Sequence, residues 1–204
     1  MRLNFNKYII VLFLLFFLIN PSLAQNKVEH KISVLVNEKI ITSYDIIQRM
    51  KLTAIIQGTN INAQNNQLLL NNTVDELIQE KLKQEKIEEY NIKIEEIEYL
   101  ESEVQFFKRY NIEKEQIKLL LNNNNVRYEE LKTLLINELS WNKLINGLFY
   151  RLTSVSDLEV DEIISKNPNI TIEQASNLVI QRQLDLKSSK LLRDILNEAT
   201  IEYK

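Results

Sequence analysis

Cysteine is absent from the 204 residues, and the chain has only two glycines, two prolines and one histidine. Without cysteine it can form no disulfide and carries no thiolate chemistry. Two isolated glycines do not build the glycine-rich loops that bind nucleotide phosphates, and they leave little material for tight hairpins. Stability must therefore come from packing, and we expect helices joined by asparagine-rich turns.

The scarcity of histidine also limits the chemistry that the chain can perform. His30 stands alone in a polar lead-in, where a surface residue without a role is the commonest outcome. A nucleophilic triad or a zinc site needs further histidine or cysteine partners. Carboxylates are abundant, but neighbours on a helix point about 100° apart and rarely converge on one substrate. We therefore predict no enzyme, no cofactor and no metal site.

The first 24 residues have the pattern of a signal peptide. Arg2 and Lys7 precede an apolar run from Tyr8 to Ile19, and Pro21 leads into small residues ending at Ala24. The run is too short to cross a bilayer as a helix, which needs about 20 apolar residues. We expect cleavage after Ala24, with retention as an N-terminal anchor as the competing hypothesis. No later segment has the pattern of a membrane span.

Cleavage would leave 23 basic against 28 acidic residues, a net charge of −5. A chain with this balance has no electrostatic reason to bind nucleic acid or an anionic lipid surface. No repeat or low-complexity linker divides residues 25–204, so we expect them to form one domain.

Hydrophobic periodicity and capping residues predict a mainly helical fold with a small amount of sheet. Serine and threonine before apolar-periodic runs mark several helix starts, because their side chains accept free amides of the first turn. The expected elements are a strand at 32–36, an extended segment at 40–42, helices from Ser43 to near Gly58, 63–90, 95–110, 113–121 and 128–152, a short helix from Ser156 through Lys166, a final helix from near Thr171, and a strand at 200–203.

The final helix carries apolar residues on two opposite sides. One face has Ala175, Leu178, Val179 and Leu186, and the other has Ile180, Leu184, Leu191 and Ile195. A helix of this kind is usually buried between other elements. We therefore expect it to close the fold, with the strand after it pairing with the strand at 32–36.

Two features lie on the helices at 95–110 and 128–152. Ile97, Leu100, Val104 and Phe107 form one stripe, and Tyr99, Phe106 and Tyr110 form a second stripe about 120° to 140° away. One stripe suffices for packing, so the second is either covered by a further helix, the more frequent case, or exposed as an aromatic patch for apolar polypeptide. We take Tyr99, Phe106, Tyr110 and Met50 as candidate client contacts. Glu138 falls within the apolar stripe of its helix and is either a buried charge or, more often at such positions, a side chain that reaches water.

Four segments, in order, resemble the SurA family of chaperones. The stretch 35–46 is similar to the family's opening Val-Asn-x-x-Ile-Ile-Thr-x-x-Asp pattern, and 77–82 to its Leu-Ile-x-x-x-Leu helix. The helix at 128–152 follows, and then 155–160 resembles the Val-Ser-Asp-x-Glu-Val step that leaves the family's N-terminal domain. The resemblance implies a compact multi-helix chaperone core with paired terminal strands.

One part of the family pattern is missing from this chain. SurA proteins continue into a glycine-rich parvulin isomerase domain, whereas here Pro168 is followed almost directly by a segment similar to the family's closing helix and strand. The core would thus comprise an N-terminal part at 25–168 and a closing part at 169–204. Prolyl isomerisation is not carried over, because the domain that performs it is absent.

The resemblance implies an ATP-independent periplasmic chaperone of a Gram-negative bacterium. In that family the core holds unfolded outer-membrane proteins on their way to the barrel assembly machinery, so both are the expected partners. The alternative hypothesis is a periplasmic structural or adaptor protein with one fixed partner, tethered by an uncleaved N-terminal segment. A residual isomerase is a third and weaker hypothesis.

Overall fold

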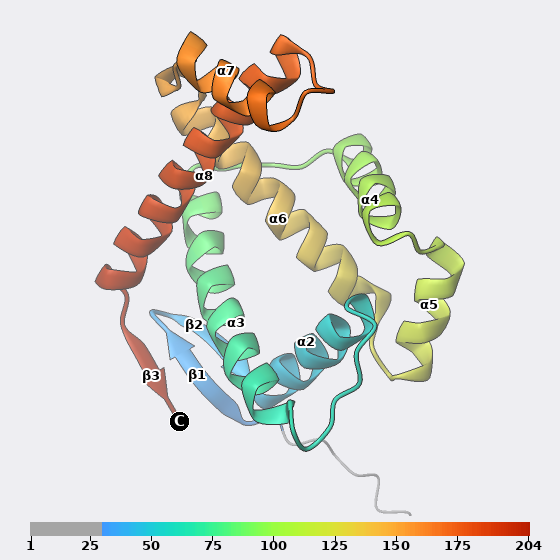
Figure 1. The fold of residues 1–204 in the computed structure, drawn as a ribbon. Coiled ribbons are helices and arrows are strands. Elements are labelled where there is room, and N and C mark those ends of the chain that lie inside the picture. Colours follow the sequence, from blue (N-terminus) through green and yellow to red (C-terminus); the bar gives the residue numbers. More distant parts are fainter. Residues whose placement is uncertain (1–29) are drawn as a thin grey trace, which may run out of the picture.

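A computed structural model describes residues 30–204, so the expected signal peptide and its cleavage site lie outside the described residues. Within that range the fold is mainly helical, as predicted (Figure 1). Its elements are β1 (Ile32–Val36), β2 (Lys39–Thr42), α2 (Ser43–Ile56), α3 (Asn66–Glu89), α4 (Glu96–Tyr110), α5 (Lys114–Asn123), α6 (Tyr128–Phe149), a 3-10 turn η1 (Tyr150–Leu152), α7 (Asp157–Lys166), α8 (Ile172–Glu198) and β3 (Ile201–Tyr203).

β1 is the central strand of a small antiparallel sheet with the order β2-β1-β3. β2 returns beside it through a tight turn, and β3 arrives on the other edge from the far end of the chain (Figure 1). Val34 pairs with Tyr203 and Val36 with Ile201. The predicted meeting of the two terminal strands is confirmed.

Side-chain caps fix several helix starts. Ser156 caps α7 and Thr171 caps α8, each accepting a backbone amide of the first turn, and these starts agree with the predicted ones. At α2 the prediction is one residue off, because Thr42 and not Ser43 is the cap. Thr42 accepts the amide of Asp45, whose carboxylate accepts the Thr42 amide at 2.8 Å. The reciprocal bonds satisfy two amides at once, which favours Thr42.

The principal core lies between the sheet and the helices α2, α3, α6 and α8. Alternation along β1 turns Val34 and Val36 inward, and the long helices bury one stripe each. Its buried members are Val34, Val36, Ile41, Ile46, Met50, Leu77, Ile78, Leu82, Trp141, Leu144, Ile145, Leu184 and Ile195.

A second core joins α2, α4, α5 and the first half of α6, and a third, smaller one joins α7 to the start of α8. The two apolar faces of α8 are explained by these partners: Ala175 and Val179 pack with α7, whereas Leu184 and Ile195 enter the principal core. The predicted double burial holds only in part, because other apolar residues of α8 remain exposed.

Asparagine occupies the left-handed backbone positions in several turns, where glycine is scarce. Asn91, Asn111 and Asn125 each follow a helix with φ near +50°, and Asn37 takes the same conformation in the β1–β2 turn. Asparagine tolerates the left-handed region better than most side chains. The predicted asparagine-rich turns are confirmed.

Candidate functional site

Helix α4 buries most of its aromatic stripe, the alternative that the sequence favoured, but it exposes the aliphatic stripe that was expected to pack. Tyr99 and Phe106 are 5% and 7% exposed, whereas Ile97, Leu100 and Val104 are 58%, 42% and 48% exposed. The aromatic stripe is therefore the one that another helix covers. Aromatic rings bury more area than aliphatic side chains, so the helix gains more by turning them inward.

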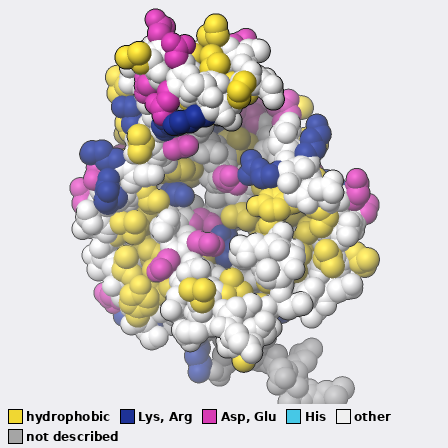
Figure 2. Space-filling view, in the orientation of Figure 1, with side chains coloured by type: hydrophobic (Ala, Val, Ile, Leu, Met, Phe, Trp, Pro, Cys, Tyr) yellow, Lys and Arg dark blue, Asp and Glu magenta, His cyan; other side chains and the backbone are white. Residues whose placement is uncertain are grey.

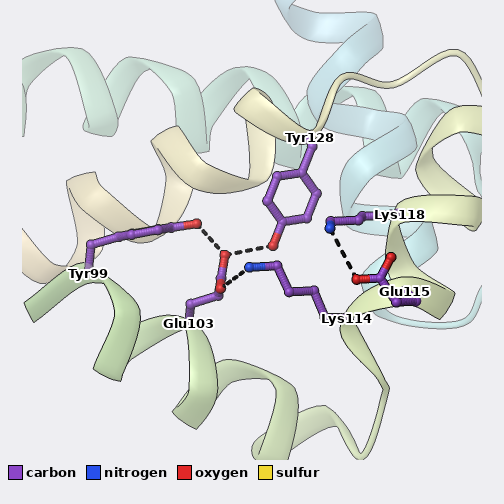
Figure 3. Close-up of polar contacts among 6 residues, drawn as sticks. All are labelled: Tyr99, Glu103, Lys114, Glu115, Lys118 and Tyr128. Carbon is purple, nitrogen blue, oxygen red and sulfur yellow. Dashed lines mark hydrogen bonds and ion pairs between the residues drawn. The ribbon is translucent and has the colours of Figure 1, made fainter. Parts of the chain in front are cut away.

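A buried carboxylate also favours this rotation of α4. Glu103 follows Tyr99 by one helical turn and is 3% exposed. It receives hydrogen bonds from the hydroxyl of Tyr99, from the hydroxyl of Tyr128 at 2.6 Å and from Lys114 Nζ at 2.5 Å (Figure 3). Because buried carboxylates need such donors, this cluster fixes α4 against the starts of α5 and α6.

The cluster shifts the ionisation of its members. Burial alone would raise the pKa of the Glu103 carboxyl, but the hydrogen bonds from Lys114, Tyr128 and Tyr99 outweigh it and hold the pKa below its ordinary value. Burial, together with the hydrogen bond to Glu103 and its charge, raises the pKa of Tyr99 and of Tyr128. The carboxylate is thus the charged member and both phenols stay protonated donors.

Cations cover the rings of the same cluster. Lys132 Nζ lies 4.7 Å from the centre of the Tyr99 ring, and the Lys114 and Lys118 ammonium groups each lie 5.7 Å from that of Tyr128. Lys118 also pairs with Glu115 at 3.1 Å (Figure 3). The cluster is therefore shielded from solvent by long basic side chains.

The outward face of α4 borders an open groove of about 740 Å³ beside α6. The groove is lined by Glu98, Leu100, Glu101, Ser102, Val104, Gln105 and Leu139. Hydrophobic side chains are visible over α4 and α5 on the right of Figure 2, where Leu119 and Leu120 of α5 are also exposed. We use the name α4 groove for the groove between α4 and α6 together with the exposed side chain of Ile97.

The four candidate client contacts are thus placed differently from one another. Tyr99 and Phe106 lie in the second core and Met50 in the principal core, so their side chains are not surface groups in this conformation. Tyr110 is exposed and packs against Phe106, with ring centres 4.8 Å apart. Of the four, only Tyr110 is a surface group in this conformation, and the contact of these residues with a client stays a prediction.

Sequence reasoning missed Glu103, although a signal was present. A carboxylate between Tyr99 and Phe106 on one stripe interrupts an otherwise apolar face. Such a position needs donors, and the tyrosine one turn earlier is one of them. The other two, Lys114 and Tyr128, are 11 and 25 residues away.

A second exposed apolar surface lies around α7 and α8. Leu158 is 82% exposed, and large apolar side chains near it are exposed as well. These are Leu152, Val155, Ile172, Leu178 and Leu186. Leu152, predicted within the α6 stripe, belongs instead to the exposed η1 turn because α6 ends at Phe149.

The centre of the face in Figure 2 is hollowed between α3 and α6, with acidic side chains around the hollow. Arg49 pairs there with Glu80 at 2.6 Å, and Lys83 lies 5.5 Å from the centre of the Trp141 ring. Burial lowers the pKa of Lys83, against the opposing effect of nearby Glu80. Glu138 is exposed at this cavity, so it reaches water and is not a buried charge.

Two further observations concern residues 30–204 only. No three histidine, cysteine or acidic side chains in this range are grouped so that they could hold a metal ion. None of the helices in this range combines the length and apolar character of a bilayer span.

Comparison with known proteins gives a likeness to solved structures alone. No protein-family model matches the sequence, and no curated protein matches it. Among solved structures, the chain is similar to one reported for the virulence factor PEB4 and the periplasmic protein Cj1289, described as two structurally related SurA-like chaperones of Campylobacter jejuni. The TM-score is 0.49 and the identity 14%, with 85% of this chain and 98% of the other covered.

Proposed function

We propose that the protein is an ATP-independent periplasmic chaperone that holds unfolded outer-membrane proteins and has no prolyl isomerase activity. The ordered SurA-like segments of the sequence supply the client class. The signal-peptide pattern supports the periplasmic location, and the scarcity of glycine supports the absence of an isomerase domain. Delivery to the barrel assembly machinery belongs to the same proposal.

The observation that carries the proposal is the outward apolar stripe of the α4 groove. Ile97, Leu100 and Val104 lie at helical spacing, and no other described element covers them. Apolar surface gains about 25 cal/mol for each Å² removed from water, which favours contact with apolar segments of another chain. Such contact is non-directional, as a binder of many unfolded clients requires.

The chain without its first 24 residues, mixed at a few-fold molar excess with a urea-diluted outer-membrane protein, tests the proposal. We expect light scattering by the client to fall strongly. A triple variant with Ile97→Ser, Leu100→Ser and Val104→Ser should lose most of this effect, because its outward stripe is polar. Failure of the unaltered chain to suppress aggregation would refute the chaperone role.

A matched control uses the second exposed surface. Leu158→Ser, Ile172→Ser and Leu178→Ser remove as many exposed apolar side chains from α7 and α8, outside the α4 groove. We expect this variant to keep most of the activity. If it loses activity while the α4 variant keeps it, the client site lies on α7 and α8 and the role assigned to the α4 groove is refuted.

Three further measurements separate the remaining hypotheses. A pull-down from periplasmic extract should recover many unfolded clients, whereas one stoichiometric partner would favour an adaptor. A proline-peptide isomerisation assay should show no catalysis above background. Mass spectrometry of the exported protein should find its N-terminus at Gln25, and an intact leader would favour the anchored form.

A further inference from the structure

We propose that the α4 groove selects client segments in which a short apolar run has lysine or arginine at one end. The inference rests on the proposed function, since it specifies which segments that site takes. It comes from the charges on the groove and on the two ends of α4.

One wall of the groove carries an unpaired negative charge. Only Glu98 and Glu101 are charged among the residues that line it. Glu98 is neutralised by Lys143, whose Nζ lies 2.7 Å from its carboxylate. Glu101 is exposed and has neither a hydrogen bond nor an ion pair within the described residues. Its carboxylate is therefore available to a cation on a bound chain.

This carboxylate lies next to the apolar stripe. Glu101 is four residues after Ile97, so the two differ by about 40° around the helix. Glu96, in the first turn, is also exposed, and its side chain makes no hydrogen bond or ion pair within residues 30–204. A segment whose apolar side chains rest on Ile97 and Leu100 would hold its next basic side chain near these acids.

The opposite end of α4 has the opposite charge. Lys108 and Arg109 are exposed in the last turn, with no ion pair within residues 30–204. Glu101 and Lys108 are seven residues apart, about 10 Å along the helix axis. An extended chain spans that length with about three residues. A basic residue is therefore attracted to Glu101 in the groove and repelled by the last turn of α4 beyond it, which gives the bound segment a preferred direction.

Two labelled peptides of about ten residues test the preference. They share one central apolar run, and one carries two lysines at its amino end where the other carries two glutamates. Binding to the chain without its first 24 residues is measured by fluorescence anisotropy at low salt. We expect the lysine peptide to bind about five-fold more tightly, in keeping with exposed ion pairs. About 0.5 M salt should remove most of the difference.

Charge reversal at the groove shows whether the preference comes from α4. Glu101→Lys should abolish or invert the difference between the peptides, whereas Glu101→Gln should reduce it. Glu198→Lys makes the same change at the exposed end of α8, on the other side of the molecule, and should leave the preference unchanged (Figure 1).

The outcomes of these experiments distinguish this inference from the proposed chaperone function on which it rests. Equal binding of the two peptides, or a preference that persists in Glu101→Lys, overturns the inference while the chaperone role stands. Aggregation suppression without binding of either peptide also overturns it, since the groove then does not take such segments. If the unaltered chain neither binds the peptides nor suppresses aggregation, the proposed function itself is refuted.

Discussion

Glu103 shows how one side chain can decide which way a helix faces. Its carboxylate lies among three donors from α4, α5 and α6, and all three bonds depend on the observed rotation of α4. Turning α4 by half a turn would expose Tyr99 and Phe106 and remove Glu103 from its donors. The exposed apolar stripe of the α4 groove is thus a consequence of a buried polar cluster.

Replacing Glu103 should be costly. Glu103→Ala leaves the hydroxyls of Tyr99 and Tyr128 without their acceptor and separates Lys114 from its partner. A hydroxyl that loses its acceptor inside the protein costs about 1 to 3 kcal/mol, so the two tyrosines give an expected loss of about 3 kcal/mol, whereas Lys114, whose side chain is 40% exposed, can turn to water. Urea unfolding should show this loss in the free energy of unfolding. Glu101→Ala, at the exposed neighbour, serves as the control and should change it by less than about 0.5 kcal/mol.

The lowered pKa of Glu103 predicts a dependence of stability on pH. The folded state favours the charged carboxylate, so its contribution is complete above the ordinary value of 4.5 and is lost as the pH falls through the depressed folded pKa. Melting temperatures of the unaltered chain and of Glu103→Gln should therefore differ most at neutral pH and converge on acidification below about pH 4.5. A constant difference down to pH 3 would contradict this assignment.

At the scale of elements, the ends of the helices could be predicted better than the face that each helix turns to the core. Ser156, Thr171 and the asparagine turns act within a few residues of themselves, so the sequence is enough to place them. The rotation of α4 was not predictable, because both of its stripes are apolar and the deciding donors come from α5 and α6. For the same reason the sequence did not show that two of the candidate client contacts, Tyr99 and Phe106, lie on the buried face of α4.

The left-handed asparagine after α4 offers a test at this scale. Asn111 has φ +48°, a conformation that costs alanine about 1 kcal/mol and costs glycine nothing. Asn111→Ala should lower the free energy of unfolding by about that amount, and Asn111→Gly should not lower it. Asn123→Ala, the same change on the right-handed backbone of α5, should be neutral within about 0.5 kcal/mol. Equal losses in both alanine variants would exclude a backbone cause.

On the scale of the whole molecule, β3 ties the far end of the chain to its first described strand. The Asn37 amide donates to the Thr200 carbonyl at 2.8 Å, and the Lys204 amide donates to the Ser33 carbonyl at 2.9 Å. A third bond joins the Thr200 amide to the Asn37 side chain. Local sequence patterns predicted both strands, and the doubly apolar α8 suggested that they meet.

Ending the chain at Ala199 should therefore weaken the whole fold. The three hydrogen bonds named above, at about 1 kcal/mol each, and the ladder between β1 and β3 give an expected loss of at least about 3 kcal/mol in the free energy of unfolding. The uncovered edge of β1 should also promote self-association, which sedimentation would detect as a concentration-dependent increase in size. Thr200→Ala keeps the Asn37 bonds to its backbone and is the control. A truncated chain as stable as the full one would contradict the closing role of β3.

The position of β1 also sets the order in which the molecule can be made. Val34 pairs with Tyr203, so nearly the whole chain must be synthesised before the central strand is hydrogen-bonded on both edges. Because the chain is synthesised from its N-terminus, β1 lacks its pairing with β3 until residues 201–203 have been made. The pairing of β1 with β3 is therefore one of the last contacts that the polypeptide can make during its synthesis.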